Sequence, residues 1–110
     1  MIILDTNALI YSIKQRIDLK KFVNEEIAVP VSAIRELEAL SDTDSNAKLA
    51  LKLIDKYRIL DVSSNGDRGI LEAATRYGGI VLTNDRKLKK DLKERNIRVT
   101  SISNRIVRKL

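Results

Sequence analysis

Short, mainly apolar runs alternate with amphipathic segments along this chain, and that alternation limits the fold more than any other feature. The apolar runs lie at residues 2–4, 27–29, 59–62, 80–83 and 97–102. Between the first two runs, Leu9, Ile10 and Ile13 stand at helical spacing. Alternating strands and helices predict right-handed crossovers and a parallel sheet with helices on both faces. We therefore expect one α/β domain over residues 1–110 with a central, mostly parallel sheet of five strands.

Local signals predict where the helices begin and end. Thr6 or Asn7 is expected to cap the first helix, and Ser32 the second. Gly78 and Gly79 are expected to close a helix, because a left-handed residue commonly follows a helix C-terminus. The segments with helical periodicity after the first are residues 32–40, 47–57, 67–77 and 86–95.

The chain contains no cysteine and no histidine. Disulfides, thiolate chemistry, Cys-based zinc sites and a histidine general base are therefore excluded. Any bound metal would need oxygen ligands, and these suit Mg²⁺, Mn²⁺ or Ca²⁺. No segment approaches 18 consecutive apolar residues, so we expect a soluble, cytoplasmic protein with no membrane partner.

Positive charge is concentrated at the end of the sequence. Residues 1–85 carry 11 Lys and Arg against 13 Asp and Glu, whereas residues 86–110 carry 10 against 2. A basic segment beside acidic residues suits a polyanion whose phosphates meet bound metal ions. For the charges taken alone, a solvated helix face followed by a basic tail is the simpler explanation.

Acidic residues stand where several apolar runs stop. Asp5 follows the first run, Asp67 opens an amphipathic segment, and Asp85 comes shortly after Leu82. Singly, each suits a helix N-terminus, where a carboxylate accepts backbone N–H bonds. If the runs are neighbouring parallel strands, however, the acids meet in one crevice at the carboxyl edge of the sheet, where such sheets bind ligands. Both interpretations stay open on the residues alone.

The same residues, taken in order, resemble the PIN-domain ribonucleases. The motifs are Asp5-Thr6-Asn7 after the first strand, Val29-Pro30-Val31-Ser32 before Glu36-Leu37-Glu38, Asp67 before Ile70-Leu71, and Thr83-Asn84-Asp85. The resemblance runs from Met1 to about Ile102. It implies a three-layer, Rossmann-like α/β/α domain whose clustered acids hold Mg²⁺ or Mn²⁺.

The resemblance also implies roles for individual residues. Asp5, Glu36, Asp67 and Asp85 would be the catalytic, metal-binding acids. Helical periodicity does not separate Glu36 from Glu38, because both border the apolar stripe, and only the family pattern favours Glu36. Asn7 and Thr83 would orient carboxylates or a water. The residues expected to guide the RNA backbone are Arg86, Lys87, Lys89, Lys90 and Lys93.

The function implied is metal-dependent endonucleolytic hydrolysis of RNA phosphodiester bonds. The family includes toxins paired with antitoxins and enzymes that mature ribosomal RNA, and its members often form homodimers. An antitoxin, a ribosomal RNA precursor and a second copy of the chain are therefore the expected partners besides RNA. Two alternatives stay open: a catalytically weak PIN-like scaffold that binds RNA or protein, and a switch domain that accepts a phosphoryl group on Asp5.

Overall fold

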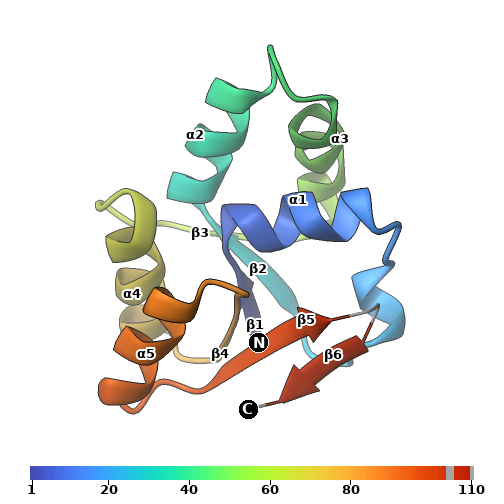
Figure 1. Cartoon of the computed structure of the whole chain (residues 1–110). Helices are drawn as coiled ribbons and strands as arrows, with labels where there is room; N and C mark the ends of the chain where they lie inside the picture. The colour runs from blue at the N-terminus through green and yellow to red at the C-terminus, as the bar shows by residue number, and fades with distance from the viewer. Residues whose placement is uncertain (104–105, 110) are drawn as a thin grey trace.

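A single six-stranded sheet forms the centre of the computed structural model, which describes residues 1–103 and 106–109 (Figure 1). The strand order is β3-β2-β1-β4-β5-β6, and the first five strands in that order are mutually parallel. The strands are β1 (Ile2–Leu4), β2 (Ile27–Pro30), β3 (Arg58–Leu60), β4 (Ile80–Leu82), β5 (Val99–Ser103) and β6 (Ile106–Lys109). The predicted five-stranded parallel sheet is confirmed.

The sixth strand was not predicted. β6 pairs with β5 in antiparallel register, with Ile102 opposite Val107. It lies in the basic segment after residue 102, for which the sequence predicted no strand. The preceding strand, β5, also begins at Val99 rather than at the expected residue 97.

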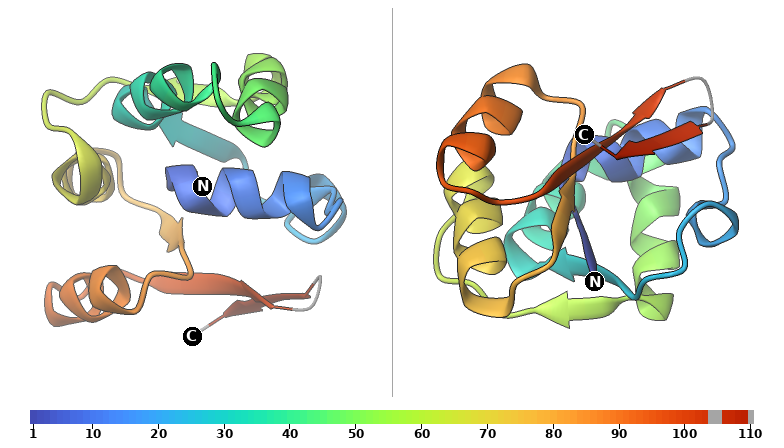
Figure 2. Two further views of the ribbon diagram at one scale, coloured as in Figure 1. Left: turned by 45° about the horizontal axis from the view of Figure 1, so that its top comes forward. Right: turned by 90° about the horizontal axis from the view of Figure 1, so that it is seen from below.

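Helices cover both faces of the sheet, as the alternation predicted. They are α1 (Thr6–Lys14), α2 (Val31–Leu40), α3 (Ser45–Leu53), α4 (Gly66–Tyr77) and α5 (Arg86–Glu94), with 3₁₀ turns at Leu19–Lys21 and Ile54–Lys56. One core cluster joins the sheet to α1, α2 and α3, and the other joins it to α4 and α5. Figure 2 shows α4 and α5 together on their side of the sheet. The fold is a three-layer α/β/α domain.

The central strand β1 belongs to both cores. Ile2 and Leu4 point into the cluster under α1, while Ile3 points into the cluster under α4, because successive side chains of a strand face opposite ways. All three side chains are at most 2% exposed. Burial on both faces explains why this strand is continuously apolar.

Several helix starts differ from the sequence-based expectation. Asp5, not Thr6 or Asn7, caps α1 by accepting the backbone N–H of Ala8. Ser32 does not cap α2, which begins at Val31 after Pro30. The fixed backbone angle of proline suits this extended position, and no side-chain cap bond forms there.

The third helix is also displaced from its predicted range of 47–57. α3 begins at Ser45, because Asp44 accepts the backbone N–H groups of Asn46 and Ala47. It ends at Leu53, where a 3₁₀ turn takes over.

Among the residues that the structure describes, no helix has the length and apolar character to cross a bilayer.

The register of the central strands places the site. Leu4 of β1 lies beside Leu82 of β4. The next residues along the two strands, Asp5 and Thr83, therefore leave the sheet side by side at its carboxyl edge.

Candidate active site

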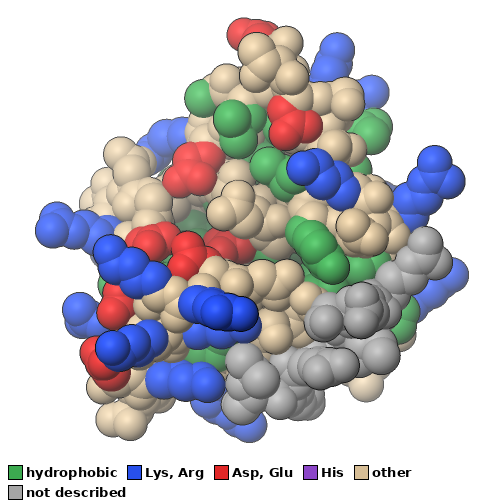
Figure 3. Space-filling model, in the orientation of Figure 1, with side chains coloured by type: hydrophobic (Ala, Val, Ile, Leu, Met, Phe, Trp, Pro, Cys, Tyr) green, Lys and Arg blue, Asp and Glu red, His purple; other side chains and the backbone are tan. Residues whose placement is uncertain are grey.

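An open pocket at the carboxyl edge of the sheet contains all four acids expected in the site. They come from four separate segments: the end of β1, α2, the start of α4 and the start of α5. The pocket is lined by Asp5, Thr6, Asn7, Ser32, Ala33, Glu36, Gly66, Asp67, Ile70 and Asp85. Figure 3 shows acidic side chains gathered around a hollow between these segments. The fold thus brings together residues that lie up to 80 positions apart in sequence.

Asp5 is the buried acid of the pocket, at 7% exposure. One carboxylate oxygen accepts the N–H of Ala8 at 2.7 Å, and the other accepts the hydroxyl of Thr83 at 2.5 Å. Burial raises the pKa of Asp5 above its usual value, and the charges of Asp85 and Asp67 act in the same direction. Asp5 is therefore both a helix cap and a member of the acidic pocket, and the two interpretations from the sequence do not exclude each other.

Thr83 connects the two acids at the ends of β1 and β4. Its hydroxyl donates to Asp5 and accepts the backbone N–H of Asp85 at 3.1 Å. Asp85 in turn accepts the N–H of Leu88 at 3.0 Å and so caps α5. Thr83 is completely buried, so its hydroxyl has little freedom to turn elsewhere.

Asp67 lies on the exposed rim of the pocket, in the first turn of α4. Desolvation raises its pKa, as do the charges of Asp85, Asp91 and Glu36, while Lys87 lowers it. The residue before it, Gly66, has a φ of 57°, in the left-handed region that glycine tolerates without strain. Asp67 thus lines the same pocket as Asp85, close enough for the charge of Asp85 to raise its pKa.

The structure distinguishes Glu36 from Glu38, which periodicity could not. Glu36 lines the pocket, and its Oε1 is 4.0 Å from where a Cβ on Gly66 would stand. Glu38 is exposed on α2 and is not among the residues lining the pocket. Asn7 is exposed and lines the same pocket.

The chemistry of these side chains fits a hard divalent cation, since every acidic donor is a carboxylate oxygen. Burial is the main cause of the raised pKa of Asp5 and of Asp67, and repulsion from the other pocket carboxylates adds to it. A bound cation would relieve that repulsion. Within residues 1–103 and 106–109, no group of three or more acids is already arranged to hold a metal ion. Coordination would therefore require some of the carboxylates to turn inward.

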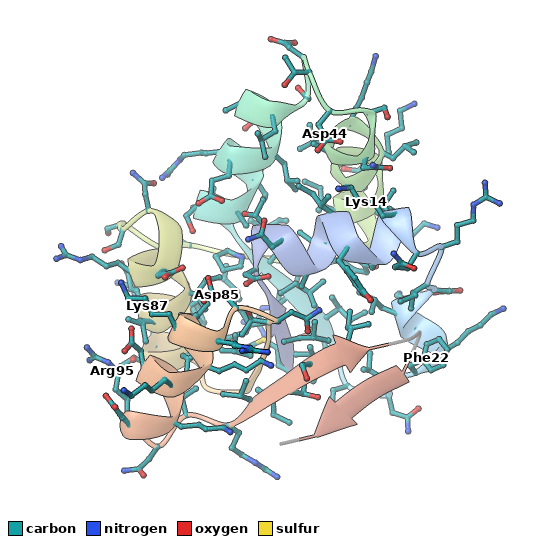
Figure 4. The ribbon with its side chains drawn as sticks, viewed as in Figure 1. Lys14, Phe22, Asp44, Asp85, Lys87 and Arg95 are labelled. Atoms are coloured by element: carbon teal, nitrogen blue, oxygen red, sulfur yellow. The ribbon has the colours of Figure 1, made fainter. Side chains whose placement is uncertain are left out.

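The five basic residues expected to contact RNA all belong to α5, beside the pocket. Leu88 and Leu92 are fully buried, which directs the charged side chains outward. Arg86, Lys87, Lys90 and Lys93 are exposed, and Lys89 is half-buried. Figure 4 shows Asp85 and Lys87 together at the start of this helix. A positive surface thus adjoins the acidic pocket, as the charge distribution suggested.

Ser32 and Gly66 are pocket residues that sequence reasoning did not assign to the site. Ser32 was expected to be a helix cap, yet it is 2% exposed and lines the pocket. A Cβ added at Gly69 would lie 2.4 Å from its hydroxyl oxygen, so α2 and α4 approach very closely there. The clustering of Gly66 and Gly69 around Asp67 was the available signal for such an approach.

Comparison with protein families decides the classification. A model of the PIN-like domain matches residues 2–105. The chain belongs to the PIN-like domain family. The predicted resemblance is thereby confirmed over nearly the whole chain.

Two curated relatives of this PIN-like domain are archaeal. The chain is 35% identical to Ribonuclease VapC9 of Archaeoglobus fulgidus over 106 residues, covering 88% of this chain and 78% of the relative. It is 34% identical to Ribonuclease VapC4 of Methanocaldococcus jannaschii over 113 residues, covering 89% and 86%.

Solved structures show the same fold. The PIN domain endonuclease Utp24 aligns with a TM-score of 0.83 at 23% identity, covering 98% of this chain and 89% of the other. A chain of VapBC2 from Rickettsia felis, bound to a DNA fragment from its promoter, aligns with a TM-score of 0.70 at 18% identity. That match covers 94% of this chain and 100% of the other.

Proposed function

We propose that this PIN-like domain is a ribonuclease that hydrolyses RNA phosphodiester bonds with the help of Mg²⁺ or Mn²⁺. The observation that carries the proposal is the convergence of Asp5, Glu36, Asp67 and Asp85 in one pocket beside the basic helix α5. Two curated relatives that share about a third of the sequence are ribonucleases, which supports the same activity here.

The four pocket acids would hold the cation, with Asp5 as the central ligand. When bound, such an ion supplies positive charge that favours deprotonation of an attacking water and stabilises the leaving oxygen. Asp5 is suited to the central position because Ala8 and Thr83 fix its two oxygens. Each contact uses one lone pair of one carboxylate oxygen, so each oxygen keeps a second lone pair that could bind the cation.

The chain has no histidine, so we assign activation of the attacking water to the cation and to the carboxylates that would hold it. Asn7, which is exposed beside Asp5, would orient the attacking water or the phosphate. Exposed lysines and arginines of α5 would bind the RNA backbone without reading its sequence.

The relatives favour a toxin-type role over maturation of ribosomal RNA. Both curated relatives are VapC ribonucleases, and one structural neighbour is a VapBC2 assembly. We infer that an antitoxin is the protein partner and that the chain acts as a homodimer in the cytoplasm.

The direct test is cleavage of single-stranded RNA by the purified chain with Mg²⁺ or Mn²⁺, with and without chelator. We expect cleavage that chelator abolishes, that Asp5→Asn abolishes, and that Asp42→Asn leaves unchanged. Asp42 is a suitable control because it is an exposed acid in the turn between α2 and α3. Retained RNA without metal-dependent cleavage would instead identify a binding scaffold, and equal cleavage by Asp5→Asn would refute the assigned site.

A further inference from the structure

The loop between β3 and α4 delivers Asp67 to the pocket, but it has no regular structure of its own. Residues 61–65 lie between the last residue of β3 and the first of α4. Within residues 61–65, the carbonyl of Asn65 accepts the N–H of Gly69 and so begins the helical ladder of α4. The other backbone groups of the loop belong to no strand or helix ladder, so side-chain contacts contribute most to holding the loop in place. The position of Asp67 depends on those contacts.

Glu72, which lies on α4 beyond Asp67, holds the middle of this loop. Its Oε2 accepts the backbone N–H of Ser63 at 2.8 Å, and its Oε1 accepts that of Ser64 at 3.0 Å. The hydrogen bond from the Ser63 amide lowers the pKa of Glu72 most, and the bond from the Ser64 amide lowers it further. Burial acts in the opposite direction, but the pKa stays below its usual value. One ionised carboxylate therefore binds two consecutive amides.

The start of the loop is also attached to α4. Arg76 and Tyr77 both donate to the carbonyl oxygen of Asp61, each at 3.1 Å. Arg76 additionally lies 3.9 Å from the Glu72 carboxylate. Glu72, Arg76 and Tyr77 thus bind the loop along the helix that follows it.

The end of the loop is attached to α2, the helix that carries Glu36. Arg35 donates to the side-chain oxygen of Asn65 at 3.1 Å. One turn into α4, Gly69 approaches Ser32 so closely that no side chain fits between them. The loop is therefore tied to α2, which carries Glu36, and to α4, which carries Asp67.

We propose that Glu72 is a positioning residue for the acidic pocket: by binding the amides of Ser63 and Ser64 it holds Asp67 opposite Asp85. The link to metal binding rests on the proposed function, whereas the control of the loop does not. Glu72 itself is not among the residues that line the pocket. It acts on the site through the backbone.

The test compares Glu72→Gln with Glu94→Gln in the full chain. Glutamine keeps the size of Glu72, but its NH₂ group cannot accept an amide N–H, so one of the two loop bonds is removed. Glu94 is an exposed helical glutamate at the end of α5 and controls for the change in charge. Arg35→Gln, which removes the attachment of Asn65 to α2, is a second variant at the other end of the loop.

The first measurement is amide hydrogen exchange, which needs neither metal nor RNA. In Glu72→Gln we expect exchange at Ser63 and Ser64, whose N–H groups Glu72 accepts, to accelerate about tenfold or more, while the amides of α5 stay unchanged. Arg35→Gln should accelerate exchange at Gly69, whose N–H donates to the carbonyl of Asn65. Glu94→Gln should leave exchange at Ser63, Ser64 and Gly69 unchanged. Wild-type exchange at Ser63 and Ser64 in Glu72→Gln would overturn the proposal, whether or not the chain cleaves RNA.

The second measurement is Mn²⁺ affinity, followed by electron paramagnetic resonance, in a double-mutant cycle with Asp67→Asn. Glu72→Gln should weaken binding about 10- to 100-fold in the wild-type background. It should have little further effect in Asp67→Asn, because its influence passes through Asp67. Equal losses in both backgrounds would overturn the route through Asp67. Absence of wild-type Mn²⁺ binding would refute the proposed function, and the exchange experiment would then decide the positioning role alone.

Discussion

The hydroxyl of Thr83 donates a hydrogen bond to the carboxylate of Asp5 across 78 residues of sequence. The pairing of Leu4 with Leu82 makes this contact possible, since it brings the ends of β1 and β4 together. The same hydroxyl accepts the N–H of Asp85. A single buried side chain thus joins two of the four pocket acids.

This contact predicts different results for two substitutions of Thr83. Thr83→Val keeps the volume but leaves the N–H of Asp85 and an oxygen of Asp5 without this partner, whereas Thr83→Ser keeps both bonds. We expect Thr83→Val to lower the free energy of unfolding by about 1–3 kcal/mol, measured by urea titration. RNA cleavage should also fall about 10- to 100-fold in the valine variant and much less in the serine variant. Equal cleavage by the valine and wild-type proteins would contradict the orienting role.

The raised pKa of Asp5 predicts that the metal-free fold loses stability as pH rises. The pKa of Asp5 in the folded state is raised above its usual value of 3.8, so the folded state holds this proton more tightly than the unfolded chain does. The free energy of unfolding therefore falls as pH increases through the raised pKa. Asp5→Asn keeps an oxygen for the N–H of Ala8 and removes this titration.

We therefore expect Asp5→Asn to melt at a higher temperature than wild type near neutral pH in chelator. The difference should shrink below about pH 4, where the Asp5 carboxyl is protonated in both states. Thermal melts across this range provide the measurement, and Asp42→Asn should follow wild type throughout. A neutral-pH melting temperature for Asp5→Asn below that of wild type would show that weaker hydrogen bonds outweigh the gain from no longer burying a charge near Asp85 and Asp67.

Divalent metal should reverse this ranking. A ligand that binds only the folded state stabilises it by about 2.7 kcal/mol at one hundred times its Kd. We expect Mn²⁺ to raise the melting temperature of wild type and of Asp42→Asn, but not that of Asp5→Asn. Removal of Mn²⁺ with chelator should restore the original value. An equal Mn²⁺ response in Asp5→Asn would place the metal elsewhere on the chain.

The close approach of α2 and α4 predicts that Gly69→Ala destabilises the fold. Alanine favours a helix over glycine by about 1 kcal/mol. Here, however, the new Cβ would lie 2.4 Å from the hydroxyl oxygen of Ser32 and 2.7 Å from the carbonyl oxygen of Ser64. We expect a net loss of about 1–3 kcal/mol in urea unfolding.

A second substitution controls for the cause of that loss. Ser32→Ala combined with Gly69→Ala removes the hydroxyl contact but leaves the carbonyl of Ser64 in place, so stability should recover only in part relative to Ser32→Ala alone. Stability of Gly69→Ala equal to or above wild type would mean that the helices separate without cost.

The parallel sheet was predictable because β1 and β4 are buried on both faces and are therefore continuously apolar. Asp5 and Asp85 stand where these strands give way to helices. Because β1 and β4 are parallel neighbours, the two acids could be predicted to lie close together. β6 escaped prediction because a strand at the sheet edge among basic residues, such as Ile106–Lys109, lacks the apolar continuity of β1. Burial leaves a pattern in sequence, whereas edge pairing largely does not.

The place of Glu36 in the pocket could not be predicted from periodicity, because one helical turn offers both Glu36 and Glu38 at the border of the apolar stripe. Only the family pattern separated them, and the placement of α2 beside α4 agrees with it. Ser32 illustrates the same limit. Its sequence position suggested a cap, but its burial depends on how closely Gly69 lets α4 approach, which is a property of tertiary packing.

The basic face of α5 predicts salt-dependent RNA binding that specific lysines control. For single-stranded RNA, each phosphate that the protein no longer neutralises should reduce the slope of log affinity against log salt concentration by about 0.7. We expect Lys87→Gln and Lys90→Gln to weaken binding and to lower this slope, measured in the catalytically disabled Asp5→Asn background. Lys52→Gln, an exposed lysine on α3 across the sheet from α5, is the matched control and should leave the slope unchanged. Equal slopes for all three variants would exclude α5 as the RNA-binding surface, because removing a charge far from bound phosphates leaves the number of released counterions unchanged.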